Sequence, residues 1–288
     1  MRTLQSALMQ ISLVFCLFCI NSKSVYAYGI ITDDAYTLDT KQTPPTSKSK
    51  KTFVIGVSNV NHFPQFDFNR DEDKGVSWAI LEAFAKRYNY KFEYRPLPPV
   101  RLQRALNDES IDFIYPDNPI WTAHRSNKDT NIYSIPIVEA VSSTFVMSQN
   151  HDLKPSEVHT VAIPYGYTPL TWLPHIDKYR MTVIPSKDLE TAMHLIRTGE
   201  AMAADIEYNV AQDIMKNNPF LSNISLNKHL PNKKVAYQLS TIKHILVLEQ
   251  LSQFYIEQKS VIEMLEDIYG IKKYEDVFTP AIPKPASD

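Results

Sequence analysis

Hydrophobic positions from residue 51 onward switch repeatedly between a strand-like and a helix-like period. Short apolar runs are typical of buried strands, whereas apolar residues that recur every three or four positions are typical of one helix face. This order of elements predicts right-handed crossovers and a mostly parallel sheet with helices on both faces. The first block predicts a strand at residues 53–57, a helix at 76–88, a strand at 92–94, a short helix at 102–106 and a strand at 111–115 that ends at Pro116.

The same alternation restarts after a β-branched run at residues 142–147. Thr168 and Pro169 have the residue types of a helix N-cap and of the first helical position. Ser186 is expected to cap a later helix, and Gly199 to end that helix. The second block predicts strands at residues 160–163, 181–184 and 235–239, a short apolar segment at 201–206 that leads to Glu207, and helical structure at 242–268.

The repeated block predicts two α/β lobes with a cleft between them. The first lobe is expected to comprise residues 51–146 and 240–280, and the second lobe residues 147–239. Two runs, near residues 144–150 and 234–240, are expected to join the lobes. The fold class is therefore α/β, with two sheets that are each flanked by helices.

The N-terminal segment has the pattern of a secretory signal peptide at residues 1–27. Arg2 supplies the charged start, residues 7–20 form the apolar core, and residues 25–27 read as a small-x-small cleavage site. An uncleaved anchor is the alternative. Residues 28–50 are expected to form a flexible tether, and residues 281–288 a loose tail. Both cysteines, Cys16 and Cys19, lie in the signal segment, so the mature core is expected to form without disulfides.

Charge and composition exclude several classes of function. Cleavage of the signal segment removes Arg2 and Lys23, so the formal net charge changes from −2 to −4, which argues against a nucleic-acid partner. The histidines have no ligand spacing, and neither a phosphate-binding loop nor a nucleophile elbow is found. The sequence predicts neither a metal nor another cofactor.

Arg125 is the first candidate binding residue. It follows the polar turn after the predicted strand at residues 111–115, and its planar guanidinium matches a carboxylate. The alternative is a surface arginine paired with an acid. Asp117 is either a turn residue beside Pro116 or an acid that faces the cleft. Four aromatic residues are expected either in the core or in the wall of a binding site, where ring faces can hold a cation: Trp121, Tyr165, Tyr167 and Trp172.

Seven segments occur in an order that resembles the family 3 periplasmic solute-binding proteins, which include the polar amino-acid receptors of ABC importers. The resemblance covers most of residues 52–275 and implies two lobes joined by two hinge crossings, which close on a ligand. The segments are HFPQFDF from His62, GVSWAILEAFAKR from Gly75, RALNDESIDF from Arg104, TAHR from Thr122, YSIPI from Tyr133, VAIPYGYT from Val161 and TAMHLIRTGE from Thr191.

The resemblance also implies roles for individual residues. Arg125 matches the arginine that grips the ligand α-carboxylate, and Thr168 a hydroxyl that contacts the same group. Glu207 matches the acid that accepts the ligand ammonium, although the family has aspartate there, and Phe66 matches an aromatic of the first lobe. Asp117 stands where the family usually has a small residue. Together, Asp117 and Glu207 would favour a ligand with a cationic group.

The expected function is periplasmic binding of a small carboxylate-bearing, amino-acid-like solute for delivery to an ABC permease or a sensor. The expected ligand-binding residues are Arg125, Glu207, Thr168, Asp117, Phe66, Tyr167 and Trp121. We expect a monomer without catalytic activity. Two alternatives stay open. One is a dehydratase-type enzyme on the same scaffold that uses Glu207, because related periplasmic dehydratases act on cyclohexadiene acids. The other is an orphan sensing module.

Overall fold

The computed structural model describes residues 49–122, 130–165 and 167–279. Residues Ser47–Asp288 cluster into one compact unit. The signal segment, nearly all of the tether, the tail and Arg125 lie outside the described residues. Among the helices that are described, none is long and apolar enough to cross a membrane.

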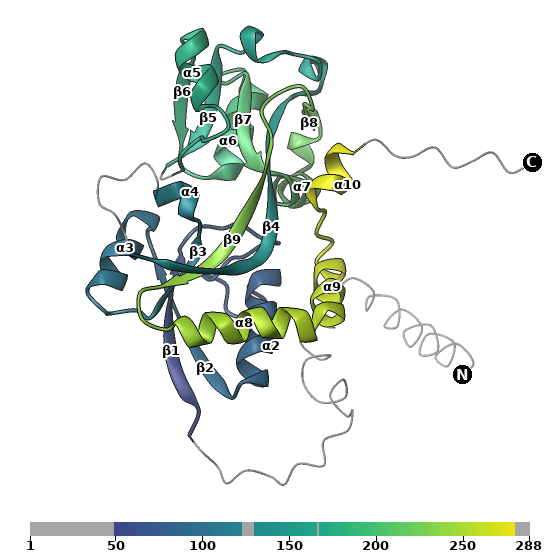
Figure 1. The fold of residues 1–288 in the computed structure, drawn as a ribbon. Helices are drawn as coiled ribbons and strands as arrows, with labels where there is room; N and C mark the ends of the chain where they lie inside the picture. Colours follow the sequence, from purple (N-terminus) through teal and green to yellow (C-terminus); the bar gives the residue numbers. More distant parts are fainter. Residues whose placement is uncertain (1–48, 123–129, 166, 280–288) are drawn as a thin grey trace, which may run out of the picture. The chain divides into compact units, whose positions relative to one another are not determined.

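A single mixed sheet runs through this unit in the order β2-β1-β3-β9-β4-β7-β5-β6, and β8 pairs with β4 (Figure 1). The strands are β1 Lys51–Ser58, β2 Tyr90–Leu97, β3 Phe113–Asp117, β4 Ile132–Met147, β5 Thr160–Pro164, β6 Thr182–Ser186, β7 Ala203–Glu207, β8 Ile224–Leu226 and β9 Lys233–Thr241. The helices are α2 Val76–Arg87, α3 Pro99–Asn107, α4 Pro119–Thr122, α5 Leu173–Tyr179, α6 Leu189–Thr198, α7 Tyr208–Asn217, α8 Ile245–Glu257, α9 Lys259–Ile268 and α10 Tyr274–Phe278.

Two parallel groups of strands lie at the ends of the sheet. Strand β1 pairs in parallel with β2 and β3, and β5 pairs in parallel with β6 and β7. We call the strands β1–β3 with α2 and α3 the first half, and β5–β8 with α5–α7 the second half. The expected α/β architecture, with a parallel group of strands in each half, is confirmed, although the two groups belong to one continuous sheet rather than to two sheets.

The long antiparallel strands β4 and β9 run from the first half to the second (Figure 1). Strand β9 pairs with β3, and β4 pairs with β9 and then with β7. Ser142 is the residue at which this change occurs, because it is paired with both Lys233 and Glu207. The two connections are therefore strands that are hydrogen-bonded to each other. The division into lobes at specific residues stays a prediction.

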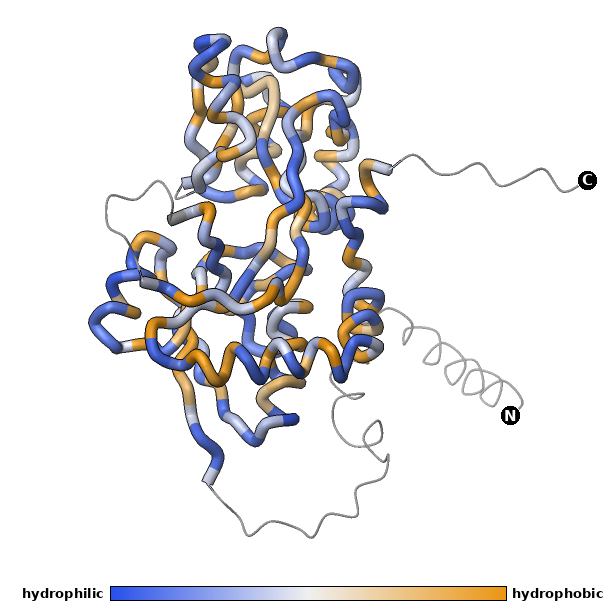
Figure 2. The backbone as a smooth tube through the Cα atoms, in the orientation of Figure 1, coloured by the Kyte–Doolittle hydropathy of each residue, from blue (hydrophilic) through white to orange (hydrophobic). Residues whose placement is uncertain are grey.

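Alternating side chains of the central strands fill two cores in the second half. Phe145 packs with the buried residues of α6, whereas its neighbour Val146 packs with Trp172 on the opposite face. This arrangement follows from the strand period of two, which sends successive side chains to opposite faces. Hydrophobic and hydrophilic positions are accordingly interleaved along the described part of the chain rather than gathered in one segment (Figure 2).

Two expectations about helix ends are wrong. Helix α5 begins at Leu173 rather than after Thr168, because the carbonyl of Pro169 accepts hydrogen bonds from Trp172 N and Leu173 N in a preceding turn. Pro174 then occupies the first turn of α5, where a proline needs no N–H partner. Asp188, not Ser186, caps α6, because its carboxylate accepts a hydrogen bond from Thr191 N at 2.8 Å.

The expected helical structure at residues 242–268 is confirmed from Ile245 onward, where it consists of two helices, α8 and α9. The backbone leaves helical geometry at Gln258, with φ −115° and ψ 28°. In Figure 1, α9 turns away from the direction of α8 at this point. The expected C-terminal glycine of α6 is confirmed, because Gly199 has a φ of 80°. Strand β3 continues past Pro116 to Asp117, and its pairing with β9 is irregular there, where a proline without an N–H is tolerated.

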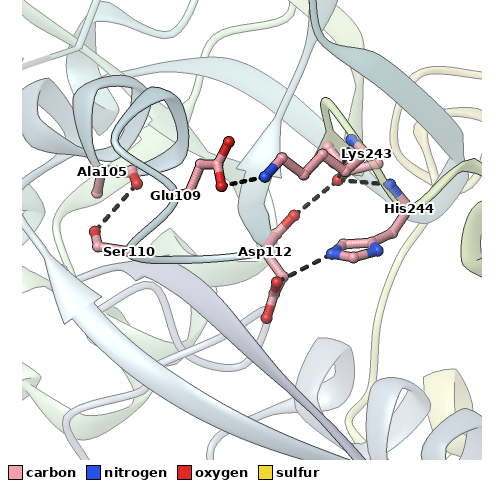
Figure 3. A network of polar contacts seen from close by, with 7 residues as sticks. Ala105, Glu109, Ser110, Asp112, Lys243 and His244 are labelled. Atoms are coloured by element: carbon pink, nitrogen blue, oxygen red, sulfur yellow. Dashed lines mark hydrogen bonds and ion pairs between the residues drawn. The ribbon is translucent and has the colours of Figure 1, made fainter.

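A polar network fastens the start of β3 to the end of β9 (Figure 3). Asp112 accepts a hydrogen bond from Val54 N at 2.7 Å, and its second oxygen lies 3.0 Å from His244 Nε2. Thr241 Oγ1 donates to the carbonyl of Asp112 at 2.8 Å. The network holds the last residue of the connecting strand β9 against the sheet of the first half.

Candidate functional site

A cavity of about 690 Å³ lies where the two halves meet. The C-terminal ends of four parallel strands supply part of its lining: Ser58 from β1, Asp117 from β3, Ile163 from β5 and Glu207 from β7. The carboxyl ends of strands are the usual place for ligand sites in open α/β sheets. The strands β4 and β9 complete the wall, for example with Ala140 and Ala236.

Six of the seven residues that we expected to bind a ligand line this cavity. They are Phe66, Asp117, Trp121, Tyr167, Thr168 and Glu207. Arg125, the seventh, lies outside the described residues. Two further aromatic candidates do not reach the cavity. Tyr165 is 69% exposed, and Trp172 is fully buried in the core, where its Nε1 donates to Thr144 Oγ1.

The loop after β1 is folded tightly, and this positions His62 and Phe66. Val76 N donates to Pro64 O, and Ser77 N donates to Gln65 O, so the loop is tied to the start of α2. Gly75 makes this possible, because its φ is 95° and an added Cβ would lie 2.7 Å from Pro64 O. The glycine is thus required by the close approach of two backbone segments.

Five aromatic rings form a cluster at one side of the cavity. His62 lies between the rings of Phe66 and Tyr167, with centroid distances of 5.0 and 6.1 Å. The ring of Tyr237 lies 5.8 Å from that of His62, and 5.9 Å from that of Trp121. Both nitrogens of His62 are within hydrogen-bond reach of a phenol: Nε2 lies 2.9 Å from Tyr237 Oη, and Nδ1 lies 3.2 Å from Tyr167 Oη. Burial lowers the pKa of His62 to about 3, so the ring is neutral.

The carboxylate of Glu207 is fully engaged by groups of the protein. Its Oε2 accepts from Val210 N at 2.8 Å, which makes Glu207 the N-cap of α7. Its Oε1 accepts from Val141 N, from the Asn209 side chain and, at 3.3 Å, from Gln65 Nε2. Burial raises the pKa of Glu207, and these four hydrogen bonds oppose that rise.

Asp117 is also held by neighbouring groups. Its Oδ1 accepts from Asn118 N at 2.8 Å. Its Oδ2 accepts from Ser240 Oγ at 2.6 Å and from Asn131 Nδ2 at 3.1 Å. Asp117 therefore joins the end of β3 to β9, in addition to lining the cavity. The structure contains features of both alternatives for this residue. Asp117 accepts a hydrogen bond from the next backbone N–H, as a turn residue does, and it also lines the cavity.

Asp205 is an acid of the cavity wall that the sequence reading missed. Its Oδ1 accepts from Ser142 Oγ at 2.8 Å, and its Oδ2 accepts from Thr171 Oγ1 at 3.1 Å. Burial raises the pKa of Asp205 to about 6, and the two hydroxyls oppose the rise. A signal was present, because residues 205 and 207 stand two apart in a strand and such residues share a face. Asp205 was not recognised as a candidate because residues 201–206 are mostly apolar and were interpreted as a short apolar segment.

The cationic residues of the described lining are at the surface. Lys234 Nζ lies 2.9 Å from Glu139 and 3.2 Å from Glu275, and Lys233 is exposed. In residues 49–122, 130–165 and 167–279, no group of three or more His, Cys, Asp or Glu side chains is placed to hold a metal ion.

No family model matches the chain, and no curated protein matches it. Solved structures do match. An ancestral arginine-binding protein bound to arginine has a TM-score of 0.62 at 17% identity, over 77% of this chain and 100% of that one. A histidine kinase sensor domain similar to periplasmic binding proteins has a TM-score of 0.61 at 13% identity, over 77% and 97% of the two chains.

A third match is an arginine transport system periplasmic binding protein from Legionella pneumophila. Its TM-score is 0.59 at 14% identity, and the match covers 76% of this chain and 100% of that one. Three structures with this likeness show that the chain has the fold of the periplasmic binding proteins. The fold implied by the sequence resemblance is confirmed.

Proposed function

We propose that the chain is a periplasmic receptor that binds a small, carboxylate-bearing, amino-acid-like solute in the cavity between its halves. The observation that carries the proposal is the convergence of Phe66, Asp117, Trp121, Tyr167, Thr168 and Glu207 on one cavity. Its volume of about 690 Å³ is within the range of about 300–1,000 Å³ that is usual for small-molecule sites. The arginine-bound and transport-system neighbours support this class of ligand.

Binding is proposed to occur by hinge closure of two lobes, with the first lobe at residues 51–146 and 240–280 and the second at 147–239. The continuous strands β4 and β9 are the two connections, which suits bending at a pair of crossings. In this proposal Arg125 grips the ligand carboxylate, a role that rests on the sequence resemblance alone. Thr168 contacts the same carboxylate, and Phe66, Tyr167 and Trp121 form the apolar wall.

The protein is proposed to act as a monomer in the periplasm after its signal segment is removed. The closed form would then be presented either to an ABC permease or to a membrane sensor. The structural neighbours include both a transport-system binding protein and a kinase sensor domain, so both partners are compatible with the fold. Growth on a candidate solute after deletion of the gene, compared with induction of nearby genes by that solute, separates transport from sensing.

A thermal-shift screen of the purified protein against amino acids, polyamines and dicarboxylates tests the proposed function. A bound solute is expected to raise the melting temperature, because a ligand that binds only the folded state stabilises it by mass action. Arg125→Ala is expected to abolish this rise, whereas the exposed Arg101→Ala serves as a control of equal charge change and is expected to leave it intact. No response to any solute class would contradict the proposal.

A dehydratase-type enzyme is the second candidate, because burial raises the pKa of Glu207 and so favours a protonated acid. The four hydrogen bonds to the same carboxylate weigh against proton transfer by this residue. Turnover of prephenate or arogenate that disappears in Glu207→Gln would establish the enzyme. A stable complex without product would exclude it.

A further inference from the structure

The two acids at the end of β7 differ in what surrounds their carboxylates. Glu207 accepts four hydrogen bonds from the protein, two of them from backbone N–H groups. It is held in place as the cap of α7. Any ligand cation would have to compete with these donors. Glu207 is therefore a poor acceptor for a ligand, although it lines the cavity.

Asp205, two residues earlier on β7, accepts within the described residues one hydroxyl on each of its oxygens, from Ser142 and from Thr171. A carboxylate oxygen has further lone pairs available for additional donors. None of the lysines or arginines in the part of the chain that is described forms an ion pair with Asp205. Among the described residues, this carboxylate in the cavity wall therefore has neutral partners.

A carboxylate out of bulk water without a counter-charge is unfavourable unless a positive group approaches it. The rise in the pKa of Asp205 that burial causes has the same physical origin. The lining of the same cavity suits a cation, because the rings of Trp121 and Tyr237 lie 5.9 Å apart and aromatic faces attract positive charge. The lysines of the lining, Lys233 and Lys234, are exposed, so they do not fill this role.

We propose that Asp205 is the carboxylate that binds a positively charged side-chain group of the ligand, with Ser142 and Thr171 orienting it. The ligand class is thereby an amino-acid-like solute that carries a side-chain guanidinium or ammonium group. This inference rests on the proposed function. It goes beyond the sequence resemblance, which assigns Glu207 to the ligand ammonium and gives Asp205 no role.

L-arginine and L-citrulline are a sharp pair of probes, because they have nearly the same shape and differ in the charge of the terminal group. Isothermal titration calorimetry of the purified protein is expected to show tighter binding of arginine. In Asp205→Asn, arginine is expected to lose about 30-fold or more in affinity, as for removal of one partner of a buried charge pair, while citrulline changes little. The preference for the cation should therefore disappear.

Two further variants distinguish residues that orient Asp205 or stabilise the fold from the residue that binds the side-chain cation. Thr171→Val removes one hydroxyl from Asp205 and is expected to reduce the preference for arginine partly, without removing it. Glu207→Gln is expected to lower the melting temperature and yet to keep the preference for arginine over citrulline. Asp152→Asn, at an exposed position on the surface, is the matched control and is expected to change neither quantity.

The outcomes distinguish this inference from the proposed function. If wild-type protein binds no solute of the panel, the proposed function fails and the assignment of Asp205 fails with it. If a solute binds and Asp205→Asn keeps the preference for arginine, or weakens arginine and citrulline equally, only the assignment of Asp205 is overturned. If Glu207→Gln loses the preference for arginine over citrulline and Asp205→Asn keeps it, Glu207 is the residue that binds the side-chain cation.

Discussion

His62 Nδ1 lies 3.2 Å from the hydroxyl oxygen of Tyr167. His62 comes from the loop after β1 and Tyr167 from the turn after β5, so this contact joins the two halves across one side of the cavity. A second contact of the same kind connects Gln65 Nε2 to Glu207 Oε1 at 3.3 Å. Both connect residues that are more than a hundred positions apart in the chain. The halves are thus held together by polar contacts of the protein itself.

Tyr167→Phe removes the hydroxyl that faces His62 and leaves the ring. The free energy of unfolding is expected to fall by about 1 kcal/mol, the usual net effect of one buried hydrogen bond. Urea denaturation followed by tryptophan fluorescence measures the change. Tyr165→Phe is the control, because that side chain is 69% exposed, and it is expected to change stability by less than about 0.5 kcal/mol. Equal losses in the two variants would contradict the structural contact.

Acid should destabilise the protein through His62. Burial lowers its pKa from 6.5 to about 3, so the unfolded chain binds more protons than the folded chain between these values. The stability from the neutral ring is therefore present above pH 6.5 and is lost as the pH falls below it, by about 2 kcal/mol between pH 7.5 and pH 5.

His62→Gln removes the titrating group but keeps a side chain that can form hydrogen bonds. Its free energy of unfolding is expected to fall less than that of the wild type over the same pH interval, and urea denaturation at both pH values measures the difference. The same pH dependence in wild type and variant would show that His62 is not buried in its neutral form.

Asp205→Asn is expected to stabilise the unliganded protein at pH 7.5. Burial raises the pKa of Asp205 to about 6, so the folded chain binds a proton more readily than the unfolded chain, and the charged form opposes folding above pH 6. The gain is expected to be about 1–3 kcal/mol. It should vanish below pH 4, where the carboxyl is protonated in both states. A loss of stability at pH 7.5 would mean that a cation of the protein already balances Asp205.

Glu207→Ala is expected to lower the free energy of unfolding by about 2–4 kcal/mol, because it removes the cap of α7, the acceptor of Val141 N and one of the two acceptors of Asn209 Nδ2. Asp188→Ala provides a matched comparison. Asp188 caps α6 through a single hydrogen bond from Thr191 N. The free energy of unfolding of Asp188→Ala is therefore expected to fall by about 1 kcal/mol. Thermal and urea denaturation of both variants measure the two losses in the free energy of unfolding, and the loss in Glu207→Ala should be the larger. A Glu207→Ala variant as stable as Asp188→Ala would mean that the additional bonds contribute nothing.

The arrangement of strands and helices was predictable because it depends on short-range periodicity. Residues 53–57 and 92–94, for example, lie within β1 and β2. The helix boundaries were less predictable, because they depend on which carbonyl accepts which N–H. Thr168 and Pro169 have the composition of a helix start, yet the turn at Pro169 delays α5 to Leu173. The interruption between α8 and α9 at Gln258 was likewise not predictable, because no glycine or proline marks it in the sequence.

The site was predictable in part. Phe66, Tyr167 and Glu207 could be placed at the cavity because the ordered motifs fix the fold, and the fold brings the ends of the parallel strands together. The partners of each side chain could not be derived from the sequence. Whether a carboxylate is free depends on three-dimensional contacts. Within the described residues, these contacts distinguish Glu207, which accepts four hydrogen bonds, from Asp205, which accepts two from hydroxyls.

Isothermal titration calorimetry with a cavity-filling variant tests the central claim most directly. Ala236 on β9 lines the cavity, and Ala236→Trp would place a large ring in it. We expect the wild-type protein to bind one molecule of an amino-acid-like solute per chain, and Ala236→Trp to bind none while its urea midpoint stays close to that of the wild type. Saturable binding that persists unchanged in Ala236→Trp would show that the solute is held elsewhere, and the cavity would not be the binding site.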